Sequence, residues 1–209
     1  MLKGRWISVV ADGEASVAPD MAVVSFAVSG DGKELAPTRD DVNKRSSAVL
    51  AKLRELTIAD ADLNAPDVGI QPQYDYRKGQ RLTVYRVVRQ MTARVRDLDS
   101  LGGVLDGLVG AGANEVHGAE MTASDPSAAE HQALRAAVAV ARAKAEALAK
   151  ASGVTLGAVA RIEEEPDRSG PPMPKMRMMA MAESVEAPTE VAAGDLTVSR
   201  RIRAWFAIS

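Results

Sequence analysis

The chain has 209 residues, of which 46% are hydrophobic but only 3% aromatic, and its formal net charge is -2 with a pI near 5.8. This length and hydrophobicity allow one large domain or two small ones, with a core of aliphatic side chains and alanine. The slightly acidic balance argues against a general binder of nucleic acid or anionic membranes, because such proteins carry an excess of basic residues.

The absence of cysteine excludes disulfides, thiolate chemistry and cysteine-based zinc or iron–sulfur sites. No apolar run reaches the roughly 18 residues that a membrane span requires, so we predict no transmembrane segment. The first residues, MLKGRWISVV, lack the apolar region of a signal peptide. The sequence therefore predicts a soluble chain that either carries no targeting signal or has already been processed.

Two strand patterns and one helix pattern open the chain. Residues 6–11 are rich in β-branched side chains, and the polar stretch 12–14 either bulges this strand or ends it. Residues 21–29 are apolar on both faces, which is typical of a covered strand, and we expect the two strands to pair antiparallel. A helix is predicted over 38–56, with a stripe formed by Val42, Ser46, Val49, Leu53 and Leu56.

The middle of the chain predicts a hairpin, a second helix and a further strand. The hairpin has strands at 68–76 and 81–96. In the longer strand Tyr85, Val87, Met91, Ala93 and Val95 face one side, and Arg86, Gln90, Thr92, Arg94 and Arg96 face the other. The helix over 97–109 contains Gly102, Gly103 and Gly107, which we expect to admit a neighbouring backbone. A strand over 114–122 follows.

The longest predicted element is a helix over 125–153. Asp125 can cap it, Ser127 and Glu130 have capping-box spacing, and Gly153 suits a left-handed end. Its expected buried stripe is Leu134, Val138, Ala141, Ala145 and Leu148, with Arg135 and Glu146 in solvent. Strands are predicted over 154–164 and 196–208, and the last one turns Leu196, Val198, Ile202, Phe206 and Ile208 to one face.

The predicted order is ββ-α-ββ-α-β-α-β-β. Strands in hairpins interleaved with helices indicate an α+β fold, in which an antiparallel or mixed sheet packs in layers against helices. We expect a single domain over residues 1–209, with a flexible excursion rich in proline and methionine at about 166–188.

Four segments taken together resemble one family. They are ISVVADGEASVAPDMAVVSFAV near the start, TARVRDLDSLGGVLDGLVGAGANEVHG in the middle, ARAKAEALAKASGVTLG at the end of the long helix, and residues 189–208. In this order, and over nearly the whole chain, they are similar to the SIMPL domain family, which includes the bacterial periplasmic immunogenic proteins. Two departures are Val84-Tyr85, where the family often has Gly-Tyr, and residues 193–195, where Pro-Gly-Glu is common.

The resemblance implies an α/β domain that is usually exported. In some members it assembles into large homo-oligomers and is associated with envelope or oxidative-stress phenotypes. It implies no substrate, and it supplies no catalytic group that could be assigned to a residue of this chain.

The candidate reactive groups form no motif that names a reaction. His117 and His131 are the only histidines, and Glu115, Glu120 and Glu130 could complete a catalytic or metal site only through the fold; the alternative is that all five are surface polar residues. The glycines at 102–103 and 110–112 form neither a dinucleotide-binding motif nor a P-loop, and no serine lies in G-x-S-x-G. The sequence therefore predicts no catalytic residue, no cofactor and no enzyme activity.

Arginines on two predicted strands form a basic stripe if those strands are neighbours. RNA or an acidic partner is one interpretation, but the aromatic side chains available for stacking are only Tyr85 and Trp205. A solvated face or an intersubunit salt-bridge face is the alternative, and we predict no nucleic-acid partner. The residues concerned are Arg86, Arg94, Arg96, Arg200, Arg201 and Arg203.

Methionines gather in the proline-bounded segment near the C-terminus. Thioethers are soft ligands suited to Cu(I), so the segment is a candidate metal site, and it could also act as an oxidisable sink. Methionine is equally an adaptable apolar residue, so a flexible or interface loop is the alternative. The candidate ligands are Met173, Met176, Met178, Met179 and Met181.

Three functional hypotheses follow. The first is a non-enzymatic, self-associating envelope or scaffold protein that forms a homo-oligomer and is periplasmic or exported, with a cytoplasmic location as the alternative. The second is a binder of a small ligand or Cu(I) that uses the methionine-rich loop. The third is an unrecognised enzyme, which a buried polar pocket with convergent histidine and carboxylate groups would favour.

Overall fold

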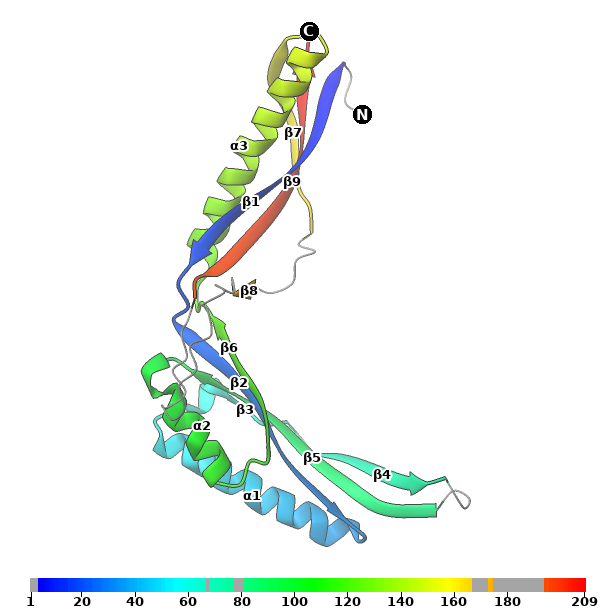
Figure 1. Ribbon diagram of the computed structural model, residues 1–209, viewed down its shortest axis with the longest axis vertical. Helices are drawn as coiled ribbons and strands as arrows, with labels where there is room; N and C mark the ends of the chain where they lie inside the picture. The colour runs from blue at the N-terminus through cyan, green and yellow to red at the C-terminus, as the bar shows by residue number, and fades with distance from the viewer. Residues whose placement is uncertain (1–3, 67, 77–80, 167–172, 175–193) are drawn as a thin grey trace, which may run out of the picture. The chain divides into compact units, whose positions relative to one another are not determined.

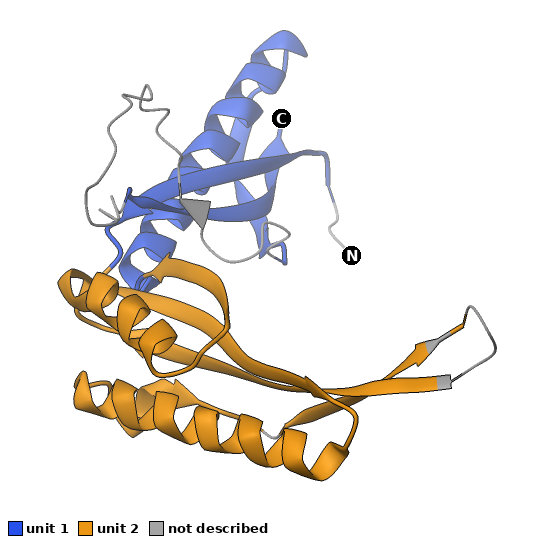
Figure 2. Ribbon diagram, turned by 60° about the horizontal axis from the view of Figure 1, so that its bottom comes forward, with its two compact units in different colours: residues 1–19, 123–180, 193–209 blue, residues 20–122, 181–192 orange. Residues whose placement is uncertain are grey.

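The computed structural model describes residues 4–66, 68–76, 81–166, 173–174 and 194–209. The chain forms two compact units (Figure 2). Unit 1 consists of residues 1–19, 123–180 and 193–209, and unit 2 of residues 20–122 and 181–192. A single domain over 1–209 stays a prediction, and most of the excursion at about 166–188, with its predicted flexibility, lies outside the described residues.

Unit 1 is a small antiparallel sheet with one helix on it (Figure 1). Its elements are β1 (Trp6–Val17), α3 (Ser127–Ala151), β7 (Leu156–Glu164), β8 (Met173–Pro174) and β9 (Leu196–Ile208). The strand order is β1-β9-β7, and β8 also pairs with β9. β1 pairs with β9 along its whole length without a register shift. The expected bulge or end at 12–14 is therefore wrong, because Asp12 pairs with Arg201 and Gly13 lies under the helix.

Helix α3 packs on β1 and β9 through an alanine at every fourth position. Gly13 of β1 lies against the helix backbone. A Cβ atom there would lie 2.1 Å from the carbonyl oxygen of Ala133 and 2.2 Å from the amide nitrogen of Ala137. The strand and the helix are therefore too close for any side chain at this position. The buried stripe of the helix is Ala129, Ala133, Ala137, Ala141, Ala145 and Ala149.

The larger side chains of α3 lie beside this stripe. Leu134 is partly buried, whereas Val138 is 40% exposed and Leu148 is 48% exposed. The expected burial of Val138 and Leu148 is wrong because the short distance to β1 selects the smallest side chains for the contact, not the most hydrophobic. Ala141 and Ala145 are buried, as predicted.

The ends of α3 follow the predicted chemistry in part. Asp125 accepts a hydrogen bond from the backbone N–H of Ser127, and Gly153 has a φ of 68° just after the last turn. The capping box is not formed, because Glu130 makes an ion pair with Arg200 of β9.

Unit 2 is a larger antiparallel sheet that is covered on one face by two helices (Figures 1 and 2). The strand order is β3-β5-β2-β6, and β4 also pairs with β5. Helices α1 and α2 contribute to one hydrophobic core with β2 and β5. The elements are β2 (Met21–Gly32), α1 (Leu35–Glu55), the 3-10 turn η1 (Asp60–Asp62), β3 (Leu63–Asn64), β4 (Gly69–Asp75), β5 (Arg81–Val95), the 3-10 turn η2 (Leu98–Ser100), α2 (Leu101–Gly110) and β6 (Glu115–Thr122).

The α+β class is confirmed, and the described strand pairs are antiparallel. The expected pairing of the first two strands is wrong. β2 lies between β5 and β6, because the chain passes from unit 1 to unit 2 at residues 19–20, before β2 begins.

The predicted faces of β5 and α1 are confirmed. Val87, Met91, Ala93 and Val95 of β5 are buried. On α1 the buried residues are Val42, Ser46, Val49 and Leu53. The alternation of β5 and the helical stripe of α1 could be predicted from the sequence because both elements bury large side chains.

The glycines of α2 do not admit a neighbouring backbone. A Cβ atom at Gly102 or Gly103 would meet no atom within 4 Å, and one at Gly107 would lie 2.7 Å from the Leu56 side chain. The close backbone approach in this chain is instead at Gly13.

We expect Gly13→Ala to destabilise unit 1 by about 1–3 kcal/mol or more, because the new methyl group has no room beneath α3. Gly102→Ala is the control. It faces open space on a helix, so it is expected to stabilise unit 2 by about 0.5–1 kcal/mol. Urea unfolding followed by circular dichroism measures both. Equal stability of the two variants would contradict the close packing of β1 against α3.

Candidate functional site

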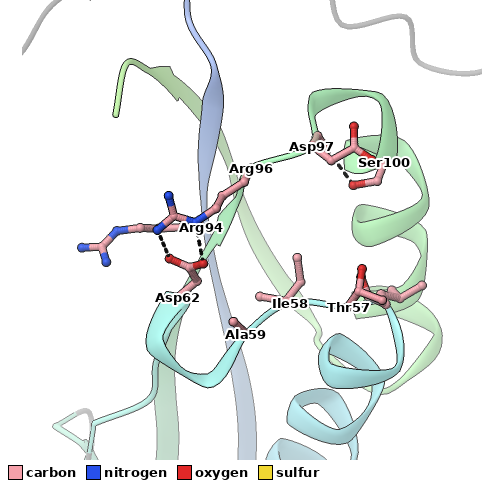
Figure 3. A pocket seen from close by; sticks show the side chains of 9 residues that line it. Thr57, Ile58, Ala59, Asp62, Arg94, Arg96, Asp97 and Ser100 are labelled. Carbon is pink, nitrogen blue, oxygen red and sulfur yellow. Dashed lines mark hydrogen bonds and ion pairs between the residues drawn. The ribbon is translucent and has the colours of Figure 1, made fainter. Parts of the chain in front are cut away.

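A cavity of about 260 Å³ lies in unit 2, where the end of α1, η1, the end of β5 and η2 meet (Figure 3). Both apolar and polar side chains line it. The residues that line it are Leu56, Thr57, Ile58, Ala59, Asp62, Arg94, Arg96, Asp97 and Ser100.

Thr57 closes helix α1 in an unusual conformation. Its backbone N–H donates to the carbonyl of Arg54, and the N–H of Ile58 donates to the carbonyl of Leu53, which is a Schellman ending. The φ of Thr57 is 64°, and it is the only non-glycine residue with a positive φ in the described part of the chain. Glycine is the usual residue here because β-branched side chains are strained in this region. The cavity therefore contains one strained residue.

Asp62 is the buried charge of the cavity. It is 8% exposed, and it accepts hydrogen bonds of 2.8 Å from Nε and 2.7 Å from Nη2 of Arg96. This two-pronged bond lowers the pKa of Asp62 below its ordinary value, against the effect of desolvation, and the charge of Arg94 lowers it further. The pair fastens η1 to the end of β5.

Three other polar side chains of the cavity, Thr57, Asp97 and Ser100, have partners within the protein. The hydroxyl of Thr57 donates to the carbonyl of Leu56, and the hydroxyl of Ser100 donates to the carbonyl of Asp97. The carboxylate of Asp97 accepts from the N–H of Asp99. These bonds are local to the end of α1 and to η2, and none of them prepares a nucleophile or a base.

A second polar cluster joins β2 and β5 to β6. Ser29 donates from its hydroxyl to Glu115 at 2.7 Å, and Arg86 donates to the same carboxylate at 2.7 Å. The side-chain amide of Asn114 bonds both the N–H and the carbonyl of Ser29, as a neighbouring strand would. The Ser29 bond lowers the pKa of Glu115, desolvation opposes it, and the charges of Arg86 and His117 lower it further.

The two histidines belong to different units. His117 lies on β6 of unit 2, half exposed, with Nε2 4.0 Å from Glu115. His131 is exposed in the first turn of α3, in unit 1. Glu130, proposed as a partner, makes its ion pair with Arg200. Among the described residues, no group of three His, Cys, Asp or Glu side chains could hold a metal ion.

The arginines do not form a stripe, because β5 and β9 belong to different sheets. Those of β9 are held in ion pairs: Arg200 with Glu130 and Glu164, Arg201 with Asp12 and Arg203 with Glu165. Arg86 of β5 pairs with Glu115 and Asp31, and Arg96, the residue after β5, pairs with Asp62. These pairs lie within one chain.

The methionine site stays a prediction. Met176, Met178, Met179 and Met181 lie outside the described residues. Met173 belongs to β8, whose backbone pairs with Thr197 of β9.

The cavity was not predicted from the sequence, although Arg94 and Arg96 were named there as members of a basic stripe. Thr57 gives no signal, because a threonine after a helix is common and its positive φ appears only in three dimensions. Asp62 and Arg96 are far apart in sequence, and each has several charged neighbours along the chain. Only the pairing of β3 with β5 brings them together.

Comparison with known proteins identifies the family. The model of SIMPL, a family of proteins of unknown function (DUF541), matches residues 7–206. The 26 kDa periplasmic immunogenic protein of Brucella melitensis biotype 1 is 33% identical over 215 residues, which cover 97% of this chain and 84% of that protein. The chain therefore belongs to the SIMPL family.

Two further relatives carry the description uncharacterized protein YggE. The one from Edwardsiella ictaluri is 34% identical, with 84% of this chain and 75% of that protein covered. The one from Escherichia coli K12 is 32% identical, with 82% and 70% covered. In the part of the chain that the structure describes, no helix combines the length and apolar character needed to cross a membrane.

We expect Asp62→Asn to lower the free energy of unfolding at pH 7 by about 1–3 kcal/mol, the usual contribution of hydrogen bonds to a charged partner. The pKa of Asp62 is lower in the folded chain than its ordinary value of 3.8, so its stabilising effect is present above about pH 4 and is lost as the pH falls through the folded value. The difference between wild type and variant should therefore shrink in acid.

Urea unfolding at pH 7 and at pH 3 measures this difference. Asp60→Asn is the matched control, since the Asp60 side chain is 74% exposed beside Arg54 and its ion pair is expected to contribute less than about 1 kcal/mol. A loss for Asp62→Asn that is no larger than this control at pH 7 would contradict the role of the Asp62–Arg96 pair.

Proposed function

We propose that this chain is a non-enzymatic protein of the bacterial envelope that acts by associating with further copies of itself. The proposal is supported first by the chemistry of the described residues. The two histidines lie in different units, and the buried hydroxyl of Ser29 donates to a glutamate rather than to a histidine base. A relative at 33% identity is described as periplasmic, which supports an envelope location. The link to envelope or oxidative stress implied by the family resemblance belongs to the same proposal.

The observation that carries self-association is an arm formed by β4 and the start of β5. β2 pairs with β5 only from Tyr85 onward, so residues 81–84 pair with β4 alone. The arm extends from unit 2 past the N-terminal start of α1 (Figures 1 and 2). An isolated two-stranded hairpin is marginally stable in water, so an arm of this kind needs further contacts.

The arm carries apolar and aromatic side chains that face solvent. Ile70 is 43% exposed, Tyr74 39%, Tyr76 72% and Leu82 37%. The rings of Tyr74 and Tyr76 lie 6.4 Å apart, so they form one aromatic surface. Tyrosine is enriched in the centres of protein interfaces, because it buries a large area with little loss of side-chain freedom. These four residues support burial of the arm against a second copy.

We expect the wild-type chain to have a solution mass of two or more chains of 22.1 kDa each. Tyr74→Ser together with Leu82→Ser should weaken association at least about tenfold, because burying each side chain contributes about 1.5–3 kcal/mol. Size-exclusion chromatography with light scattering over a concentration series measures this. Val109→Ser, at a side chain 62% exposed on α2, is the control and should leave the mass unchanged. A monomeric wild type would refute the proposal.

A further inference from the structure

In the part of the chain that the structure describes, β7 is an edge strand of the unit 1 sheet. Among the described residues its only strand partner is β9. Val159 and Ile162 are opposite Phe206 and Ala204, which are buried under α3, yet each of the two remains 44% exposed. The reason is that α3 packs mainly on β1 and β9. Within the described residues, β7 therefore presents backbone groups without a strand partner together with apolar side chains, as an unprotected edge does.

The opposite edge of the same sheet, β1, is protected by a lysine side chain. Lys144 of α3 reaches over β1 and donates from Nζ to the carbonyl of Val10 at 2.9 Å. A lysine at this place occupies a backbone acceptor and sets a charge beside the edge, which discourages another strand from pairing there. An added strand can therefore enter the sheet at β7 more readily than at β1.

We propose that β7 pairs antiparallel with β7 of a second copy, about a two-fold axis at Ile162, so that two sheets join edge to edge. This rests on the proposed function and names the surface that unit 1 contributes to it. The register between β7 and β9 is regular from Arg161 to Glu164, while shifts occur before Arg161. Pairing between copies is accordingly centred on this regular stretch, since register shifts interrupt a ladder.

Charge selects the register. On the sheet face away from α3, Arg161 and Glu163 alternate with Ile162 and already form an ion pair with each other within one strand. With the axis at Ile162, Arg161 lies opposite Glu163 of the second copy, and Glu163 lies opposite its Arg161. An axis at Glu163 or at Arg161 would place like charges opposite each other. Only the central register makes both pairs attractive.

The other face of the joined sheet gains an apolar contact. Ile162 lies opposite Ile162 of the second copy, and Val159 extends the apolar surface on the same face as α3. The strand thus contributes the same residues to both sides of the contact, which is the property of an isologous interface.

The first test is a cysteine cross-link in a chain that has no cysteine of its own. Residues opposite each other in an antiparallel pair have Cα atoms roughly 4.5–5.5 Å apart, within the range of a disulfide. Under mild oxidation Ile162→Cys should give a covalent dimer that reductant reverses. Ala139→Cys, on the exposed side of α3, is the control and should stay monomeric on a denaturing gel.

The second test uses charge. Arg161→Glu chains should self-associate through β7 at least about tenfold more weakly, because two like-charged pairs form, and Glu163→Arg chains should do the same. When the two variants are mixed in equal amounts, each glutamate of one strand lies opposite an arginine of the other, so hetero-association should return to the wild-type level. Analytical ultracentrifugation of each variant and of the mixture measures this, and circular dichroism checks that both are folded.

The outcomes separate the two proposals. If the wild type has the mass of several chains but Ile162→Cys does not cross-link, or the mixture does not recover, the β7 contact is wrong while self-association stands. If the wild type has the mass of one chain, self-association itself fails. A cross-link together with recovery in the mixture establishes the contact.

Discussion

The short distance between α3 and β1 is the constraint on which unit 1 depends. Because Gly13 lies against the backbone of Ala133 and Ala137, the helix rests low on the sheet. A helix with small side chains is roughly 10 Å wide, and strands are spaced about 4.8 Å apart, so it covers two strands of three. The third strand, β7, keeps Val159 and Ile162 in solvent. The exposed edge is therefore a consequence of how the alanine stripe packs.

In unit 2 the helices pack on the sheet through large side chains. Phe26, Met91, Leu53 and Leu108 fill the space between its sheet and its helices, and all of them are almost fully buried. Two helices cover the sheet where β2 is present, but the pairing of β4 with β5 continues beyond the end of β2. The apolar residues of the arm are exposed because the strands are longer than the layer that covers them.

The sequence predicted best where burial is carried by large residues. The alternation of β5 and the stripe of α1 could be predicted, because large apolar side chains at a regular interval indicate a buried face. The stripe of α3 was predicted wrongly for the same reason. The large side chains of Leu148 and Val138 were assigned to the buried face, but alanines make the contact. Pairing between distant segments leaves no local signal. β1 pairs with β9 rather than with β2, and Asp62 of the cavity meets Arg96 only after β3 has joined β5.

The two proposed contact surfaces, the β7 edge and the arm, differ in the assemblies that they can form. An isologous contact such as that of β7 uses the same residues on both chains, so it closes at two copies and cannot extend further by itself. The arm belongs to the other unit and uses different residues, so a chain that has both can continue from one dimer to the next. Long-range charge attraction contributes little to the proposed assembly, because the net charge is only -2 and the arginines of β7 and β9 cited here are paired within the chain. In the proposed assembly, recognition between copies therefore rests on contact at short range, through backbone pairing and the register in which Arg161 meets Glu163.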